Sequence, residues 1–191
     1  MVAVAGFLGL RRGEIEGLRW EDILPDAVRV ERSMWAGKAH DTKTAASRGL
    51  VPLIPVLRVI LEGHRLRSGN PTSGPLFPTR NGTPINLNNL LNDQILPTLR
   101  RCARCGKAFD KPHVGHMYVR DESRPDWTGF HSFRRGLATN LNSLGVEDLT
   151  IQKILRHSSV EVTRRAYIRT LPAQTTEAMG RLQGKLTSMI Q

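Results

Sequence analysis

The chain has 191 residues, enough for one substantial hydrophobic core and about one domain. It contains 28 lysines and arginines against 17 aspartates and glutamates, which gives a formal net charge of +11. A charge of this size on a small domain favours a polyanionic partner, and it favours nucleic acid over a membrane surface. The sequence has neither a basic amphipathic anchor nor an apolar run long enough to span a bilayer. Composition therefore argues against a membrane protein.

Two further features concern the cellular compartment. Residues 2–10 are apolar but precede the first arginines, whereas a signal peptide carries its positive charges first. The two cysteines, Cys102 and Cys105, form one C-x-x-C, which does not make a framework of secreted disulfides. We therefore expect a cytoplasmic protein.

The N-terminal segment predicts helical structure over residues 2–18, with a break near Gly9. Beyond the break, Arg11 and Glu14 share a helix face because they lie about one turn apart. Considered locally, such a pair is a surface ion pair worth roughly a few tenths of a kcal/mol.

The periodicity changes after residue 27. Val28 and Val30 alternate with charged residues, and residues 50–53 form a second short apolar segment. Alternation of this kind predicts short β-strands with a turn between them.

Two helices separated by a loop follow the predicted strands. The pattern predicts a helix over Pro55–Arg67 and another over residues 86–101, opened by Asn86 or Asn88. Residues 68–84 are rich in proline and glycine and predict a loop, which a Leu-Phe-Pro passage anchors to the core.

A C-x-x-C and an H-x-x-H lie close together in the sequence, formed by Cys102, Cys105, His113 and His116. Two thiolates and two imidazoles are suitable ligands for tetrahedral Zn²⁺, which would stabilise the fold of a segment poor in apolar residues. The gap between the pairs is seven residues, shorter than the roughly 12 of a C₂H₂ zinc finger. Two interpretations stay open: a structural zinc, or two buried cysteines with two solvated histidines. Hydrolytic zinc is not expected, since protein ligands would fill all four positions.

The stretch 131–167 predicts two helices joined by a glycine-containing turn, and then a third. In the first helix, His131 and Arg134 lie one turn apart near the N-terminus, where oriented N–H groups favour an anion. An apolar face is predicted from five residues, Phe133, Leu137, Ala138, Leu141 and Leu144.

The remaining two helices complete a cluster of cationic side chains and a tyrosine. Apolar residues at helical spacing predict a second helix that stops at His157. Ser158 and Glu161 have the spacing of a capping box for a third helix, which carries Tyr167. This combination predicts a phosphate site with a nucleophile.

These motifs together resemble the tyrosine recombinases, the phage integrase family. The resemblance rests on Gly-Leu-Arg11-x-x-Glu14 followed by Leu-x-Trp-x-Asp, on Asp-Thr-Lys43-Thr, and on His131-x-x-Arg134, Leu-Arg-His157-Ser-Ser and Tyr167. The family usually has glycine immediately before the second histidine, where this chain has Arg156. Two neighbours compete with the assigned residues: Arg12 with Arg11, and Lys38 with Lys43.

The resemblance implies six catalytic residues: Arg11, Lys43, His131, Arg134, His157 and Tyr167. Tyr167 would attack a scissile DNA phosphate, form a 3′-phosphotyrosine and release a 5′-hydroxyl. Arg11 and Arg134 would bind the phosphate, with Glu14 orienting the first arginine. No catalytic metal or other cofactor and no ATP is implied.

The resemblance also implies an architecture. It predicts a mainly α fold with a small antiparallel β-sheet, the DNA breaking-rejoining catalytic domain, over residues 1–171. The Cys/His segment at about 102–128 would be an insertion and residues 172–191 a helical tail. The family's usual N-terminal core-binding domain is expected to be absent. Double-stranded DNA is the implied partner, with a homotetramer on DNA in the full-length form.

Two other functions remain open from the sequence. The chain fits a catalytically idle DNA-binding remnant of a mobile-element integrase. It also fits a type IB topoisomerase-like enzyme, which nicks and reseals one strand with similar chemistry. Formation of a covalent DNA adduct separates the idle remnant from either enzyme.

Overall fold

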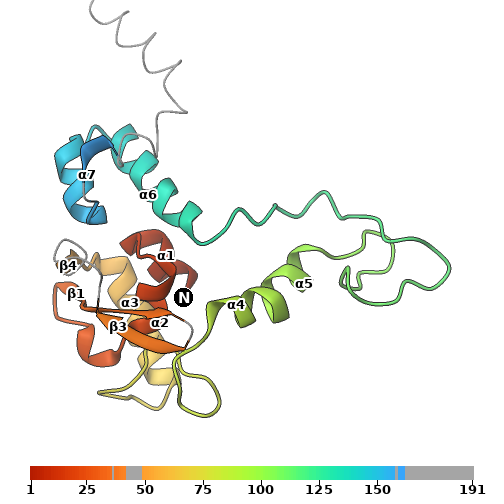
Figure 1. Cartoon of the computed structure of the whole chain (residues 1–191), viewed down its shortest axis with the longest axis horizontal. Helices are drawn as coiled ribbons and strands as arrows, with labels where there is room; N and C mark the ends of the chain where they lie inside the picture. The colour runs from red at the N-terminus through yellow and green to blue at the C-terminus, as the bar shows by residue number, and fades with distance from the viewer. Residues whose placement is uncertain (36, 42–48, 158, 162–191) are drawn as a thin grey trace, which may run out of the picture.

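The computed structural model describes residues 1–35, 37–41, 49–157 and 159–161 (Figure 1). The described elements are α1 (Val2–Leu8), α2 (Arg12–Gly17), the 3₁₀ helix η1 (Trp20–Asp22), β1 (Ala27–Val30), β2 (Arg32–Trp35), β3 (Lys38–Asp41), β4 (Gly49–Pro52), α3 (Pro55–Arg67), α4 (Leu87–Leu90), the π-helical segment η3 (Leu91–Ile95), α5 (Leu96–Leu99), α6 (His131–Ser143) and α7 (Asp148–Leu155). Over these ranges the prediction of a mainly helical chain with a small antiparallel sheet is confirmed. No helix in them is long and apolar enough to cross a membrane.

The strands form two antiparallel pairs. β1 pairs with β4, from Ala27 opposite Pro52 to Val30 opposite Gly49, and β2 pairs with β3. The valines of β1 face the core, since Val28 and Val30 are almost fully buried. Their alternation with charged residues was therefore a correct indicator of a strand with one buried face.

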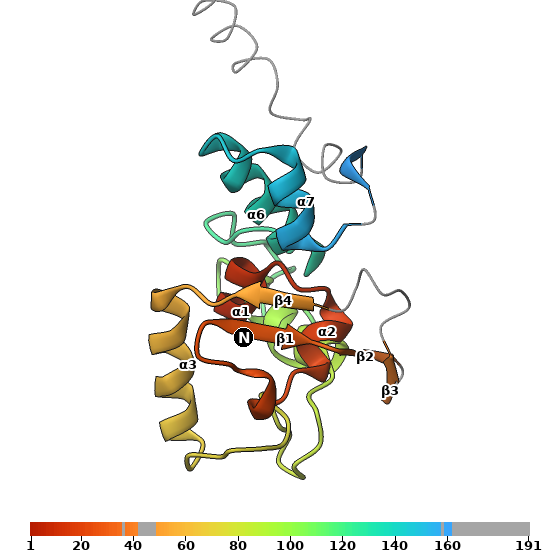
Figure 2. The same ribbon diagram turned by 90° about the vertical axis from the view of Figure 1, so that its left-hand side faces the viewer.

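The larger hydrophobic cluster joins the N-terminal helices to the sheet and to α3. It consists mainly of Val4, Ala5, Leu8, Leu10, Ile15, Leu18, Trp20, Val28, Val30, Val51, Leu53, Leu57, Leu61, Leu76, Phe77 and Leu87. Leu76 and Phe77 anchor the loop over residues 68–84, as predicted, and the Leu76 carbonyl lies 2.9 Å from His64 Nε2. Figure 2 shows α3 along one side of the strands.

A smaller cluster holds α6 against α7. Its buried members are Ala138, Ile151 and Leu155. The prediction for Leu144 is wrong: this side chain is 78% exposed, because α6 ends at Ser143 and the chain turns away. The second helix also ends earlier than predicted, at Leu155, because Arg156 adopts the left-handed conformation with φ 54°.

The helix predicted over residues 86–101 is irregular. Asn86 caps it as expected, but α4 passes through a π-helical segment before α5, which ends at Leu99. Pro97 explains the irregularity, since it lacks an N–H and its ring crowds the carbonyl four residues earlier. Residues 100–128 then project away from the rest of the molecule and return to α6 (Figure 1); we call this segment the arm.

Gly9 connects the two clusters and provides a test of how they pack. It ends α1 at φ 56°, and a Cβ there would lie 2.7 Å from Leu155 Cδ2 and 2.9 Å from Leu137 Cδ2. Gly9→Ala should therefore lower the free energy of unfolding by about 1–3 kcal/mol, from left-handed strain and overpacking. Urea unfolding measures this change.

Gly6 offers a matched control within the same helix. A Cβ at Gly6 meets nothing within 4 Å. Gly6→Ala should stabilise the chain by up to about 1 kcal/mol, because alanine has the higher helix propensity. Equal effects of the two substitutions would contradict the close packing at Gly9.

Candidate active site

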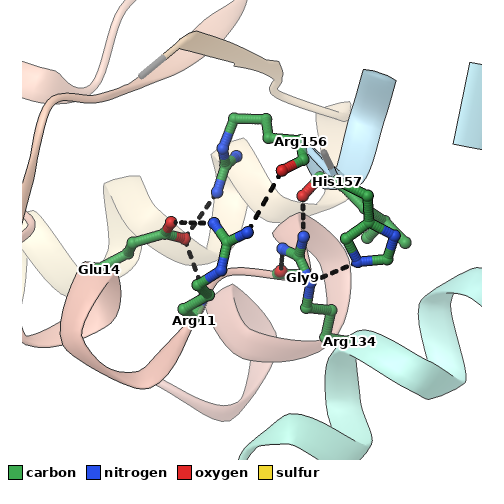
Figure 3. Close-up of polar contacts among 7 residues, drawn as sticks. Gly9, Arg11, Glu14, Arg134, Arg156 and His157 are labelled. Atoms are coloured by element: carbon green, nitrogen blue, oxygen red, sulfur yellow. Dashed lines mark hydrogen bonds and ion pairs between the residues drawn. The ribbon is translucent and has the colours of Figure 1, made fainter. Parts of the chain in front are cut away.

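The candidate site lies where the two hydrophobic clusters meet. The junction between α1 and α2 contributes Gly9, Arg11 and Glu14, while α6 and the end of α7 contribute Arg134 and the pair Arg156–His157 (Figure 3). Residues from the two ends of the described chain are thus brought together in one polar layer.

Glu14 organises the first half of this layer. Its carboxylate is 2% exposed and accepts hydrogen bonds from the backbone N–H and Nη1 of Arg11, both at 2.8 Å. Arg156 Nη2 donates to the same carboxylate at 2.6 Å. A carboxylate bonded to two guanidinium groups is held in one orientation, and so are its partners.

Arg134 organises the second half. Its side chain is 1% exposed, and its Nη1 donates to the Gly9 carbonyl at 2.6 Å. Nη2 donates to the Leu155 carbonyl, and Nε donates to His157 Nε2 at 3.0 Å. Arg134 therefore ties α6 to the ends of both α1 and α7, while these three bonds leave two of its five N–H groups for another acceptor.

Arg156 is the residue that the sequence analysis noticed only as a departure from the family pattern. It occupies the left-handed region, which is why glycine suits this position. Its side chain is 5% exposed and reaches Glu14 across 142 residues of sequence. Its carbonyl oxygen also accepts a hydrogen bond from Arg11 Nη2 at 3.3 Å. The signal available from the sequence was the family's glycine at this position; neither the left-handed turn nor the ion pair was visible there.

The structure separates Arg11 from its competitor Arg12. Arg12 Nη1 lies 2.5 Å from Asn88 Oδ1, and its Nε lies 3.8 Å from Glu16. Arg12 therefore points toward α4, whereas Arg11 lies beside Glu14 and Arg156.

The two histidines of the site flank Arg134. His131 is the first residue of α6 and is exposed, while His157 is half-buried at the end of α7. Partial desolvation by neighbouring atoms, followed by the charges of Arg134, Arg135 and Arg11, lowers the pKa of His131. Burial and the charges of Arg134 and Arg11 lower the pKa of His157 to about 4. Both imidazoles are consequently neutral at pH 7 in the free protein.

The guanidinium groups respond to the same excess of positive charge. Burial, together with Arg11 and Arg156, lowers the pKa of Arg134 to about 9, although Glu14 acts in the opposite direction. Burial likewise lowers the pKa of Arg156. Within the described part of the chain, this polar layer holds three guanidinium groups and one carboxylate, which bonds two of them, so it is short of negative charge. An anion would relieve this imbalance.

Two predicted catalytic residues cannot be placed. Lys43 and Tyr167 lie outside the described residues. The alternative lysine, Lys38, begins β3 opposite Trp35 and is exposed. Of the six predicted catalytic residues, the structure brings together the four that it describes: Arg11, His131, Arg134 and His157.

The cysteines and histidines of the arm form a separate cluster. The ligand atoms of Cys102, Cys105, His113 and His116 all lie within 4.8 Å of one another. The alternative of two buried cysteines and two solvated histidines is wrong, because Cys105 is exposed and both imidazoles are partly buried beside the sulfurs.

Comparison with known proteins identifies the family. The phage integrase family matches residues 1–174. The chain belongs to the phage integrase family. A tyrosine recombinase XerC-like protein of Caldanaerobacter subterraneus subsp. tengcongensis is 27% identical over 198 aligned positions, which cover 90% of this chain and 45% of the relative. The chain therefore spans about half the length of that relative.

Solved structures show that its fold is shared. The Tn1549 transposon integrase, in complex with circular intermediate DNA, matches 95% of the chain with a TM-score of 0.66 at 20% identity, and 58% of the integrase is covered. The XerA recombinase matches 95% with a TM-score of 0.60 at 18% identity, and 56% of it is covered. The predicted DNA breaking-rejoining fold is confirmed.

The buried pair of Glu14 and Arg156 can be tested by a double-mutant cycle. Glu14→Gln, Arg156→Met and the double variant should give a coupling of about 0.5–3 kcal/mol in urea unfolding, because the groups are desolvated. Arg19 and Glu21 provide the control: their atoms are also 2.6 Å apart, but both side chains are about 40% exposed. That pair should couple by about 0.2–1 kcal/mol. Similar coupling in both cycles would argue against an organising role for Glu14.

The lowered pKa of His157 predicts how stability depends on pH. The unfolded imidazole takes up a proton near pH 6.5, whereas the folded one does so only at about pH 4. As pH falls through this window the unfolded chain binds more protons, so the free energy of unfolding should fall. His157→Gln should weaken the slope measured by urea unfolding from about pH 7 to pH 5. An unchanged slope would contradict the assignment.

Proposed function

We propose that this chain is the catalytic domain of a site-specific DNA recombinase, which cuts and rejoins DNA through a 3′-phosphotyrosine intermediate. The observation that supports this most strongly is the surplus of guanidinium groups at the candidate site. A scissile phosphate supplies the negative charge that Arg11, Arg134 and Arg156 do not receive from Glu14 alone.

In the proposed reaction, the phenolic oxygen of Tyr167 attacks the phosphorus of a DNA phosphodiester. The bond between phosphorus and the 5′ oxygen breaks, and Lys43 gives that oxygen a proton to form the free hydroxyl. His131 takes the proton of the phenol. The reverse steps with a new 5′-hydroxyl join the exchanged strand and release the tyrosine.

The cationic residues address the main difficulty of this chemistry. A tyrosine with an ordinary pKa near 10 is only about 0.1% ionised at neutral pH, so the nucleophile needs cationic neighbours or a base. Arg11 is 40% exposed and can donate to a non-bridging oxygen. Arg134 is fixed by Gly9, Leu155 and His157, so its charge and remaining N–H groups are preorganised for the transition state.

His157 fits a supporting role at the phosphate. Its neutral ring accepts a hydrogen bond from Arg134 at Nε2. An arriving phosphate would raise its pKa, and the ring would then donate a hydrogen bond.

Metal and ATP independence belong to the same proposal. The arginines stabilise the charge that develops on the phosphoryl oxygens, a role that metal ions have in many phosphoryl-transfer enzymes. The phosphotyrosine keeps the energy of the broken bond, so rejoining needs no ATP.

Complete strand exchange between two duplexes requires a cut in each participating strand. We propose that each cut uses the Tyr167 of a separate protomer, and hence that a homotetramer assembles on double-stranded DNA. Such a protein would act at the nucleoid in the cytoplasm.

The proposal predicts the effect of removing one oxygen atom. Tyr167→Phe should abolish covalent attachment to DNA and leave DNA binding nearly unchanged, because only the nucleophile is lost. The substrate would be a library of nicked duplexes with randomised sequence around the nick, in buffer without Mg²⁺ or ATP. Denaturing gels detect the adduct, and mobility shifts measure binding.

Tyr118→Phe is the matched control, since Tyr118 belongs to the arm, which projects away from α1, α2 and α7 (Figure 1). This variant should retain the adduct. Loss of the adduct in Tyr118→Phe rather than in Tyr167→Phe would contradict the assignment. DNA binding without any adduct in the unaltered protein would favour the idle DNA-binding remnant.

A further inference from the structure

The Cys/His cluster of the arm has the composition and geometry of a metal site. Cys102 Sγ lies 3.3 Å from His116 Nε2, and Cys105 Sγ lies 3.3 Å from His113 Nδ1. All four ligand atoms lie within 4.8 Å of one another. Each of these two contacts joins a cysteine of the C-x-x-C to a histidine of the H-x-x-H, so the two motifs lie together in space.

The two sulfur–nitrogen contacts match the size of a tetrahedral zinc site, and the widest separation of up to 4.8 Å would have to shorten on binding. Zinc–sulfur bonds of about 2.3 Å and zinc–nitrogen bonds of about 2.0–2.1 Å place neighbouring ligand atoms about 3.3–3.8 Å apart. The two observed sulfur–nitrogen distances are at the lower end of that range. Two sulfur and two nitrogen ligands in a tetrahedral arrangement are typical of zinc.

Backbone hydrogen bonds position the two cysteines. The Gly106 N–H donates to the Cys102 carbonyl at 2.8 Å, and the Cys102 N–H donates to the Lys107 carbonyl at 2.8 Å, which closes a tight turn around the cysteines. Gly106 has φ 68°, a conformation that suits glycine. These backbone hydrogen bonds hold Cys105 near Cys102.

The histidines are oriented differently, and each has one nitrogen toward a sulfur. His116 Nδ1 lies 3.1 Å from the Val114 carbonyl, so a proton on Nδ1 leaves Nε2 free to bind a metal. A carbonyl partner of this kind fixes the tautomer of metal-binding histidines. His113 presents Nδ1, and its ring packs beside Tyr118 with centroids 5.5 Å apart.

The arm buries little apolar surface, although ion pairs and backbone hydrogen bonds join parts of it. Within residues 100–128, all of which the structure describes, Cys102 alone is buried. Some of its large apolar side chains are almost fully exposed, with Val114 at 82% and Met117 at 88%. A segment that buries so little apolar surface does not offset the entropy of ordering its backbone.

We infer that Cys102, Cys105, His113 and His116 bind one structural Zn²⁺ that holds the arm in its folded shape. All four coordination positions are filled by protein, so the ion stabilises structure and activates no water. The site is distinct from the candidate active site, and the inference does not depend on the proposed recombinase activity.

Metal analysis of the whole chain, purified without chelator, provides the first test. We expect about one zinc per chain. Cys105→Ser and His113→Ala should each lower this content severalfold. Met117→Ser, next to a ligand but 88% exposed, should leave it unchanged. Replacing zinc with Co²⁺ should give the visible absorption of a tetrahedral thiolate site.

Hydrogen exchange separates a structural role from mere binding. Removing zinc with EDTA should increase exchange in residues 100–128 and leave α1, α6 and the sheet protected, since these have their own clusters. Adding ZnCl₂ after the chelator is removed should restore protection in the arm.

Three outcomes would overturn the inference. The first is purified protein that lacks zinc and takes up none from ZnCl₂. The second is an intact mass showing a disulfide between Cys102 and Cys105. The third is full zinc content in Cys105→Ser and His113→Ala. The covalent DNA assay reports on Tyr167 and not on the arm, so the two proposals fail independently.

Discussion

The structure of the site depends on one buried carboxylate. Glu14 accepts hydrogen bonds from Arg11 and Arg156, and this arrangement joins the N-terminal helices to the end of α7. A buried carboxylate without those partners would be strongly destabilising, and so would the arginines without it. The pair thus acts as a structural link and sets the direction of Arg11. It leaves the arginines undercompensated, which makes the site receptive to an anion.

The candidate active site lies at the boundary between the two hydrophobic clusters. Polar side chains of the site also join these clusters, so the same bonds serve stability and function. Leu8 and Leu10 belong to the larger cluster, Leu155 belongs to the smaller one, and Gly9 lies between them. Arg134 bonds to the carbonyls of Gly9 and Leu155, which lie at the ends of helices. Helix ends leave carbonyls without partners, so a buried arginine is well suited to satisfy them. Precise placement of that arginine therefore follows from the packing of the clusters.

The arm differs from the body of the molecule in how its chain is held in place. The body of the molecule has two clusters of buried apolar residues, whereas Cys102 alone is buried in residues 100–128. Ligand atoms from two short motifs converge instead, and a metal ion would replace the missing core. The contrast explains how a long excursion between α5 and α6 can keep a defined shape outside the main clusters.

The amino-acid sequence by itself determined the family motifs, the helices with strong periodicity and the identity of the site residues that lie within one helical turn. His131 and Arg134 are of this kind, because residues at i and i+3 share a helix face in any fold. Only the tertiary structure decided what depends on distant segments meeting. Arg12 points to α4 while Arg11 faces the site, and Arg156 reaches Glu14 across 142 residues. Local periodicity carries no information about such contacts, because they exist only after the two clusters have packed.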